Sequence, residues 1–124
     1  MTLTERRVGT VTVLDLEGAL TIGDGALRLK DRIDSLVLQE RTSVVLNLAG
    51  IRYVDSEGLG QLVGCYTSLA KTPGGLKLLS VGTRTMTLLR ITRLNTILET
   101  FESEDDAVSS FPELLAVASQ ERKS

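Results

Sequence analysis

The sequence contains no histidine and no tryptophan, and it has one cysteine, Cys65. Without histidine, the Ser-His-Asp and Cys-His arrangements of common hydrolases are excluded, and a metal site would depend on carboxylates and one thiol. A single cysteine cannot form an internal disulfide bond, which is typical of proteins from a reducing compartment. We therefore expect a protein that is not an enzyme and that holds no metal.

Aromatic rings are also scarce, and neither sign of charge is in large excess. The rings are those of Tyr53, Tyr66, Phe101 and Phe111. They are too few to stack on bases or to line a large cofactor pocket, and the net charge of -2 leaves no basic patch. No stretch reaches the roughly 20 apolar residues of a membrane span, and the polar start leads into no signal-peptide run. We expect an aliphatic core, no cofactor, no nucleic-acid or membrane partner, and a cytoplasmic location.

The chain does contain alternating strand and helix patterns. β-Branched and leucine residues on both sides of Gly9 predict strands over 3–7 and 11–17, joined by a tight turn. Further strands are expected at 43–51, 76–81 and 95–101, and helices at 26–40, after residue 55, at 83–92 and at 103–120. Crossover connections of this kind demand parallel strands. The sequence therefore predicts an α/β fold with a mixed central sheet, about four packed helices, and the apolar segment 43–51 at its centre.

The length of 124 residues fits one domain, with a core of about 3–112 and a frayed tail at 118–124. In the last helix, Ser103 and Asp106 resemble a capping box. Pro112 is disruptive inside a helix, so we expect a kink near residue 110 or a restart capped by Ser110. Earlier in the chain, the arginines at 84, 90 and 93 are interpreted as a solvated helix face.

Residues 53–64, YVDSEGLGQLVG, place an acid, a hydroxyl and three glycines at the start of a helix. Each glycine in a helix interior costs roughly 1 kcal/mol relative to alanine. Helical spacing assigns these residues to the core face: Leu59, Leu62, Val63, Tyr66, Leu69 and Ala70. Glu57, Gly60, Gln61 and Gly64 fall on the opposite face, with Cys65 at the edge between the two.

Two interpretations of this segment stay open. Gly60 and Gly64 either let another protein approach closely or receive a neighbouring part of the same fold. Ser56 is either an ordinary helix N-cap or a surface hydroxyl that accepts a phosphoryl group. A phosphate there would bring about -1.5 to -2 charges into any docked partner. Asp55 could be an ordinary loop acid near a helix N-terminus.

The segment LNLAGIRYVDSEGLGQLVGCYTSLAKTPGGLKLLSV resembles the STAS domain family, specifically the stand-alone bacterial anti-sigma factor antagonists. The shared pattern is a buried strand that leads into an Asp-Ser-x-Gly-Leu turn, a helix, a Gly-Gly turn and a second buried strand. The resemblance covers about residues 3–112. It implies an antagonist that binds an anti-sigma factor, itself a serine kinase of the GHKL ATPase type, and so frees a sigma factor.

The resemblance also implies residue roles. The kinase would phosphorylate Ser56 and so end the complex, and a phosphatase would reset the antagonist. The expected partner surface comprises Thr21, Asp24, Asp55, Ser56, Glu57, Gly58, Gly60, Gln61 and Gly64. Many family members have Asp or Asn where this chain has Thr21, which weakens the inference about kinase contact more than that about fold.

Two other classes of function remain open. STAS domains also serve as constitutive subunits, as stressosome scaffolds or as the small partner of lipid-transporting ABC systems, and these would not be controlled by phosphate on Ser56. A nucleotide-binding enzyme is a weak alternative, because the GDG and GLG segments lack the P-loop lysine and the full dinucleotide fingerprint. We expect a monomer or a weak homodimer.

Overall fold

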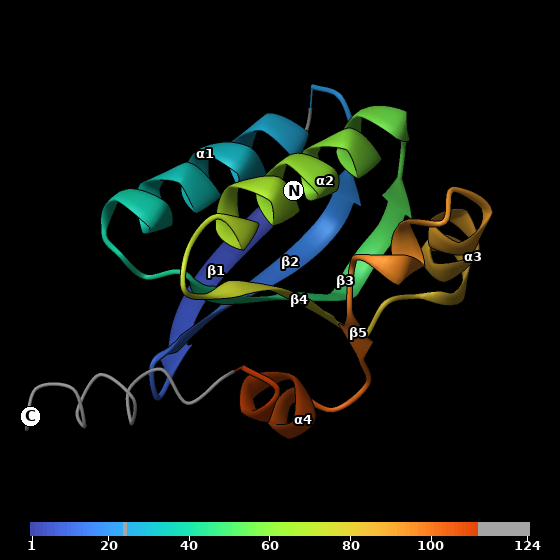
Figure 1. Cartoon of the computed structure of the whole chain (residues 1–124). Helices are drawn as coiled ribbons and strands as arrows, with labels where there is room; N and C mark the ends of the chain where they lie inside the picture. The colour runs from blue at the N-terminus through green and yellow to red at the C-terminus, as the bar shows by residue number, and fades with distance from the viewer. Residues whose placement is uncertain (24, 112–124) are drawn as a thin grey trace, which may run out of the picture.

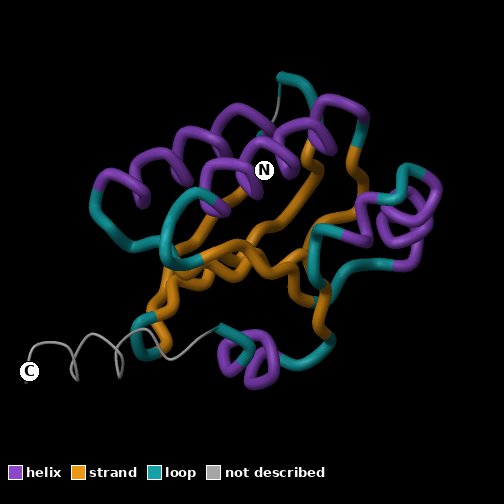
Figure 2. Tube along the Cα trace, in the orientation of Figure 1, coloured by secondary structure: helices purple, strands orange, loops and turns teal. Residues whose placement is uncertain are grey.

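The computed structural model describes residues 1–23 and 25–111, which form a five-stranded sheet with helices on both faces (Figures 1 and 2). The elements run β1 (Thr2–Val8), β2 (Val11–Leu20), α1 (Ala26–Leu38), β3 (Ser43–Val54), α2 (Ser56–Ala70), β4 (Gly75–Leu79), α3 (Thr83–Ile91), the 3-10 helix η1 (Leu94–Thr96), β5 (Thr100–Phe101) and α4 (Glu104–Ser109). The order of strands and helices is the predicted one, apart from η1.

The sheet has the order β1-β2-β3-β4-β5, so the chain builds it from one edge to the other. β1 pairs antiparallel with β2 through the turn at Gly9, whose φ of 63° suits a residue without a side chain. The pairs β2 with β3, β3 with β4, and β4 with β5 are parallel. The mixed sheet and the central place of β3 confirm the sequence prediction.

The helices cover the two faces unequally. α1 and α2 lie side by side on one face, and α4 lies on the other (Figure 1). The larger core fills the α1 and α2 side with leucine and isoleucine, whereas the smaller one packs Ala107 and Phe111 against valines of β2 and β3. This arrangement leaves the N-terminus of α2 at the edge of the sheet where β2 and β3 end.

One predicted boundary is wrong, and another prediction is covered only in part by the described residues. The strand expected at 95–101 is reduced to Thr100–Phe101, because Arg93 adopts a left-handed φ of 62° and turns the chain into η1. The last helix ends at Ser109 within the described residues, with Ser110 as its C-cap. The predicted cap at its start is confirmed, since the Ser103 hydroxyl accepts from the amide of Asp106. Pro112 and the predicted tail lie outside the described residues.

The buried face of α2 also differs from the prediction. Leu59, Leu62 and Leu69 are buried as expected, but so is Cys65, with no exposed surface. Ala70, predicted for the core, is exposed. The face is rotated because Gly58 packs directly on β2, which turns the Gly58 and Cys65 side of the helix toward the sheet.

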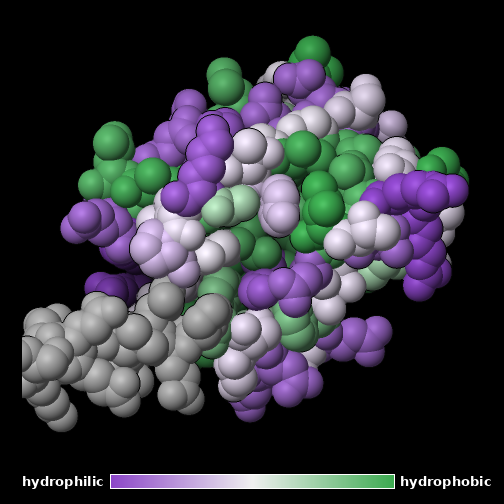
Figure 3. All heavy atoms as spheres, viewed as in Figure 1, coloured by the Kyte–Doolittle hydropathy of each residue, from purple (hydrophilic) through white to green (hydrophobic). Residues whose placement is uncertain are grey.

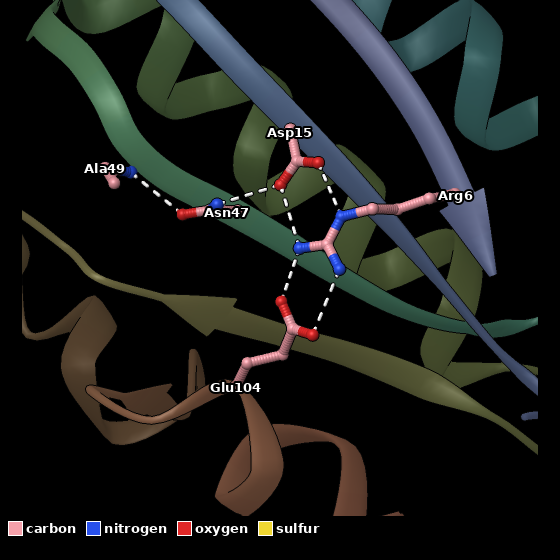
Figure 4. A network of polar contacts seen from close by, with 5 residues as sticks. All are labelled: Arg6, Asp15, Asn47, Ala49 and Glu104. Atoms are coloured by element: carbon pink, nitrogen blue, oxygen red, sulfur yellow. Dashed lines mark hydrogen bonds and ion pairs between the residues drawn. The ribbon is translucent and has the colours of Figure 1, made fainter. Parts of the chain in front are cut away.

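An ion-pair network attaches α4 to the sheet (Figure 4). The Arg6 guanidinium on β1 donates to Asp15 on β2, with Nε to Oδ2 at 2.6 Å, and to both carboxylate oxygens of Glu104. Asn47 on β3 donates to the same Asp15 at 2.8 Å. Arg6 holds the pKa of Asp15 and that of Glu104 below their ordinary values. One arginine therefore joins β1, β2 and the first residue of α4.

Replacing Arg6 with methionine keeps the aliphatic stem and removes the network. Because the network is partly exposed, we expect a loss of about 1 kcal/mol of unfolding free energy at neutral pH. Both carboxyl pKa values are lowered by folding, so this contribution is present above the ordinary carboxyl range and is lost as pH falls through the folded pKa values. Urea unfolding at pH 7 and pH 3 tests this: the difference between wild type and Arg6→Met should shrink at pH 3. An equal difference at both pH values would contradict the electrostatic account.

Candidate functional site

Asp55 closes the turn between β3 and α2. Its Oδ1 accepts from the amide of Gly58 at 2.7 Å, which makes Asp55 the N-cap of α2. Its Oδ2 accepts from the amide of Ile22 at 3.0 Å, in the loop that follows β2. One carboxylate thus accepts a hydrogen bond from a backbone amide in the first turn of α2 and also holds the neighbouring loop beside that turn. The alternative that Ser56 is the N-cap is wrong, because Asp55 fills that position.

The hydrogen bonds from Gly58 and Ile22 hold the pKa of the Asp55 carboxyl below its ordinary value. Folding therefore gains stability from ionised Asp55 above the ordinary carboxyl pKa, and loses it as pH falls through the lower folded value. Asp55→Asn keeps only one oxygen acceptor and carries no charge. We expect amide exchange of Ile22 or Gly58 to speed up on the order of tenfold at neutral pH. Amide exchange followed by NMR measures this, and unchanged rates at both residues would contradict the role of Asp55.

Gly58 is required by a close contact between α2 and β2. A Cβ atom built at Gly58 would lie 1.9 Å from the backbone oxygen of Leu20, a distance that no side chain can adopt. The amide of Asp55 donates to that same oxygen at 3.3 Å. The end of β2 therefore fixes where α2 begins. Gly58, expected on the partner surface, is instead buried, because this glycine lets the helix touch the strand.

Ser56 is the first residue of α2 and is exposed. Within the described part of the chain, its hydroxyl makes no hydrogen bond to another residue. The side chain stands at the positive end of a 15-residue helix, where backbone amides and the helix dipole stabilise an anion. The structure thus leaves the Ser56 hydroxyl accessible at the start of α2.

The predicted glycines differ in surroundings. Gly60 lies one helical turn after Ser56, and nothing is within 4 Å of a Cβ built there. At Gly64 the built Cβ would lie 3.3 Å from Cε of Lys30 on α1. The prediction of an open surface thus holds at Gly60, whereas Gly64 receives a side chain of the same fold. Gln61 beside them is half-buried, and its amide lies 3.4 Å from the Glu57 carboxylate.

Two grooves lie at the start of α2, and Ser56 lines one of them. The first, called here the α3 groove, has a volume of about 470 Å³ and lies between the start of α2 and helix α3, lined among others by Tyr53, Ser56, Leu59, Arg84, Leu88 and Ile91. The second, called the α1 groove, lies between the start of α1 and α2 and is lined by Ile22, Leu27, Glu57 and Gln61 with neighbouring residues. Figure 3 shows hydrophobic atoms gathered between the start of α2 and α3. Ser56 thus stands beside apolar surface.

Most exposed large apolar side chains of the described residues lie in these grooves. Four of the six belong to them, namely Ile22, Leu27, Tyr53 and Ile91, with exposed fractions of 73%, 67%, 46% and 75%. Helical and strand periodicity did not predict this group, since its members come from three separate segments of the chain. Isolated exposed apolar residues are common, whereas several of them gathered in two grooves at one end of a helix are typical of interaction surfaces.

Thr21 lies in the loop that Asp55 anchors. Its carbonyl accepts from the amides of Gly25 and Ala26 at 3.3 and 3.4 Å, so its backbone leads into α1. The bond from the Ile22 amide to Asp55 holds this loop beside the start of α2. Asp24, the other loop residue predicted for that surface, lies outside the described residues.

The described residues contain no reactive thiol, no cluster of metal ligands and no helix suited to span a membrane. Burial raises the pKa of the Cys65 thiol to about 12, so this thiol is protonated and unreactive at neutral pH. Among residues 1–23 and 25–111, no group of three potential metal-ligating side chains is found. Over the same residues, no helix is both long and apolar enough to cross a membrane.

Comparison with known proteins identifies the family. The model of the STAS domain matches residues 3–107, and the chain belongs to the STAS domain family. Comparison with curated protein sequences finds no match.

Solved structures share this fold. The Thermotoga maritima protein TM1081 is 22% identical, with a TM-score of 0.80 over 86% of this chain and 92% of that one. An anti-sigma factor antagonist from Mycobacterium paratuberculosis is also 22% identical, with a TM-score of 0.78 over 88% and 92%. The anti-sigma factor antagonist SpoIIAA in its unphosphorylated form is 18% identical, with a TM-score of 0.70 over 87% and 96%. These similarities confirm the predicted α/β fold.

Proposed function

We propose that this protein is an anti-sigma factor antagonist controlled by phosphorylation of Ser56. With Ser56 unmodified, it binds an anti-sigma factor that is also a serine kinase of the GHKL ATPase type, and so frees a sigma factor. Phosphorylation of Ser56 by the same kinase ends the complex, and a phosphatase restores it. The observation that carries the proposal is the exposed Ser56 hydroxyl at the N-terminus of α2, where it lines the apolar α3 groove and precedes Glu57 of the α1 groove.

The local electrostatics support a switch of this kind. Phosphate on Ser56 would be stabilised by the start of α2, so the fold would tolerate it. The same phosphate would place about -1.5 to -2 charges next to Glu57 and in the middle of an apolar contact surface. A docked partner would have to desolvate that charge. Phosphorylation therefore acts on the interface and leaves the fold intact.

The relatives support the proposal at the level of class. The Mycobacterium paratuberculosis protein and SpoIIAA are both anti-sigma factor antagonists, and SpoIIAA from Bacillus is also known in a phosphorylated form. This chain belongs to the STAS domain family, and its Ser56 is the first residue of α2. A bait experiment is designed to identify the partner kinase.

The test uses Ser56→Ala and Ser56→Glu proteins as baits in lysate of the native organism, followed by mass spectrometry. We expect a GHKL-type kinase on the alanine bait and its loss from the glutamate bait. A Ser35→Glu bait adds the same charge at an exposed serine of α1 that lines neither groove, and it serves as the control for charge alone. If both Ser56 baits hold the same proteins, a constitutive scaffold or a lipid-transport ABC subunit becomes the better account.

A further inference from the structure

Arg84 lies in the first turn of α3 and faces the same groove as Ser56. Both residues line the α3 groove, Ser56 from the start of α2 and Arg84 from α3. The side chain of Arg84 is exposed, and among the described residues it forms no ion pair with a carboxylate. The other lining groups of this groove are apolar side chains, hydroxyls of threonine, and Asp55, whose carboxylate is bound to backbone amides. Arg84 is therefore the cation of the α3 groove.

Tyr53 holds the guanidinium at the groove. The central carbon of the Arg84 guanidinium lies 5.6 Å from the centre of the Tyr53 ring, which is the distance of a cation-π contact. Tyr53 is the penultimate residue of β3 and stands three residues before Ser56. The contact thus holds the guanidinium, which has no carboxylate partner among the described residues, over a ring near the serine in sequence. An exposed cation-π contact is weaker than a charge-assisted hydrogen bond, so a nearby dianion can displace it.

We propose that Arg84 binds the phosphate group when Ser56 is phosphorylated, as a positioning residue that moves from the Tyr53 ring to the phosphate oxygens. This inference rests on the proposed function, since it concerns the modified form of Ser56. The guanidinium fork matches phosphate oxygens in two parallel hydrogen bonds, and the backbone amides of α2 contribute from the other side.

The pairing has two consequences. The phosphate is held on the α3 groove instead of extending into solvent, so a phosphatase must first break its bond with Arg84. The phosphate also neutralises the positive charge of Arg84. After phosphorylation, Arg84 would no longer be able to bind a carboxylate of a docked partner. Arg84 would thus act in the switch without forming any covalent bond itself.

The experiment places phosphoserine at position 56 during synthesis and follows the second ionisation of the phosphate by ³¹P NMR against pH. A bound guanidinium favours the dianion, whose second pKa is about 6 in free phosphoserine. We expect Arg84→Gln to raise this pKa by about 0.5 to 1 relative to the unsubstituted chain. The effect should weaken in 1 M salt, because the pair lies at the surface. Arg84 is exposed, so its replacement is compatible with folding, which the ¹⁵N spectrum checks.

Arg90→Gln is the matched control, because Arg90 is exposed on the same helix and does not line the α3 groove. It should titrate like the unsubstituted phosphoprotein. Equal titration curves for Arg84→Gln and Arg90→Gln would overturn the role of Arg84. That outcome would leave the Ser56 switch standing, whereas absence of a kinase on the alanine bait would remove the switch without changing the titration.

Discussion

Gly58→Ala is expected to destabilise the protein by about 3 kcal/mol, a large fraction of the stability of a small domain. The added methyl group would lie 1.9 Å from the Leu20 oxygen, and the contacted atom belongs to the backbone of a central strand. Neither α2 nor β2 can move without breaking the bond from Asp55 to that same oxygen. Urea unfolding of the purified variant measures the loss.

Gly60→Ala is the matched control for that substitution. It adds the same methyl group two residues later on the same helix, in open space. Alanine is the better helix former, so Gly60→Ala should stabilise the protein by up to about 1 kcal/mol. A Gly58→Ala protein as stable as Gly60→Ala would mean that α2 does not start on the end of β2.

Gly60→Leu is expected to weaken binding of the partner kinase by about 100-fold, which is about 2.7 kcal/mol. Gly60 lies one turn after Ser56 and between the two grooves, where a leucine side chain would project from the contact surface. The stability of the free protein should be unchanged or slightly higher. Affinity is measured with the kinase captured on the alanine bait.

Glu5→Gln is the control for a substitution outside the proposed docking surface. Glu5 lies on β1, where it pairs with Arg32 and Arg41 and is away from Ser56. It should bind the kinase like the unsubstituted protein. Full affinity of Gly60→Leu would contradict the proposed docking surface. We choose Gly60 over Gly64 because a leucine at position 64 would also displace Lys30 from the face of α2.

The order of elements could be predicted because each depends on a local pattern. Strand and helix periodicities, the turn at Gly9 and the apolar run of β3 are all contained in short windows of sequence. The predicted length of β5 is too great because the start of this strand depends on the left-handed conformation of Arg93. Nothing in the neighbouring sequence predicts that conformation. Local pattern thus determined the elements but not all of their ends.

The candidate site was predicted only in part. Ser56, Asp55 and Gly60 follow from the motif, and the structure adds that Asp55 is the cap and that Gly60 is open. The contact of Gly58 with Leu20 joins segments far apart in the chain, so helical spacing alone misjudged the buried face of α2. Arg84 was interpreted as part of a solvated face, because its partner Tyr53 lies on another element. Contacts of this kind have no local signal.

The central claim is that phosphate on Ser56 decides whether the partner binds. Its most direct test is calorimetric titration of the purified partner kinase with two forms of this protein, one with serine and one with phosphoserine at position 56. The account predicts at least about 100-fold weaker binding of the phosphoserine form, with both forms equally stable to urea. Equal affinities of the two forms would contradict it.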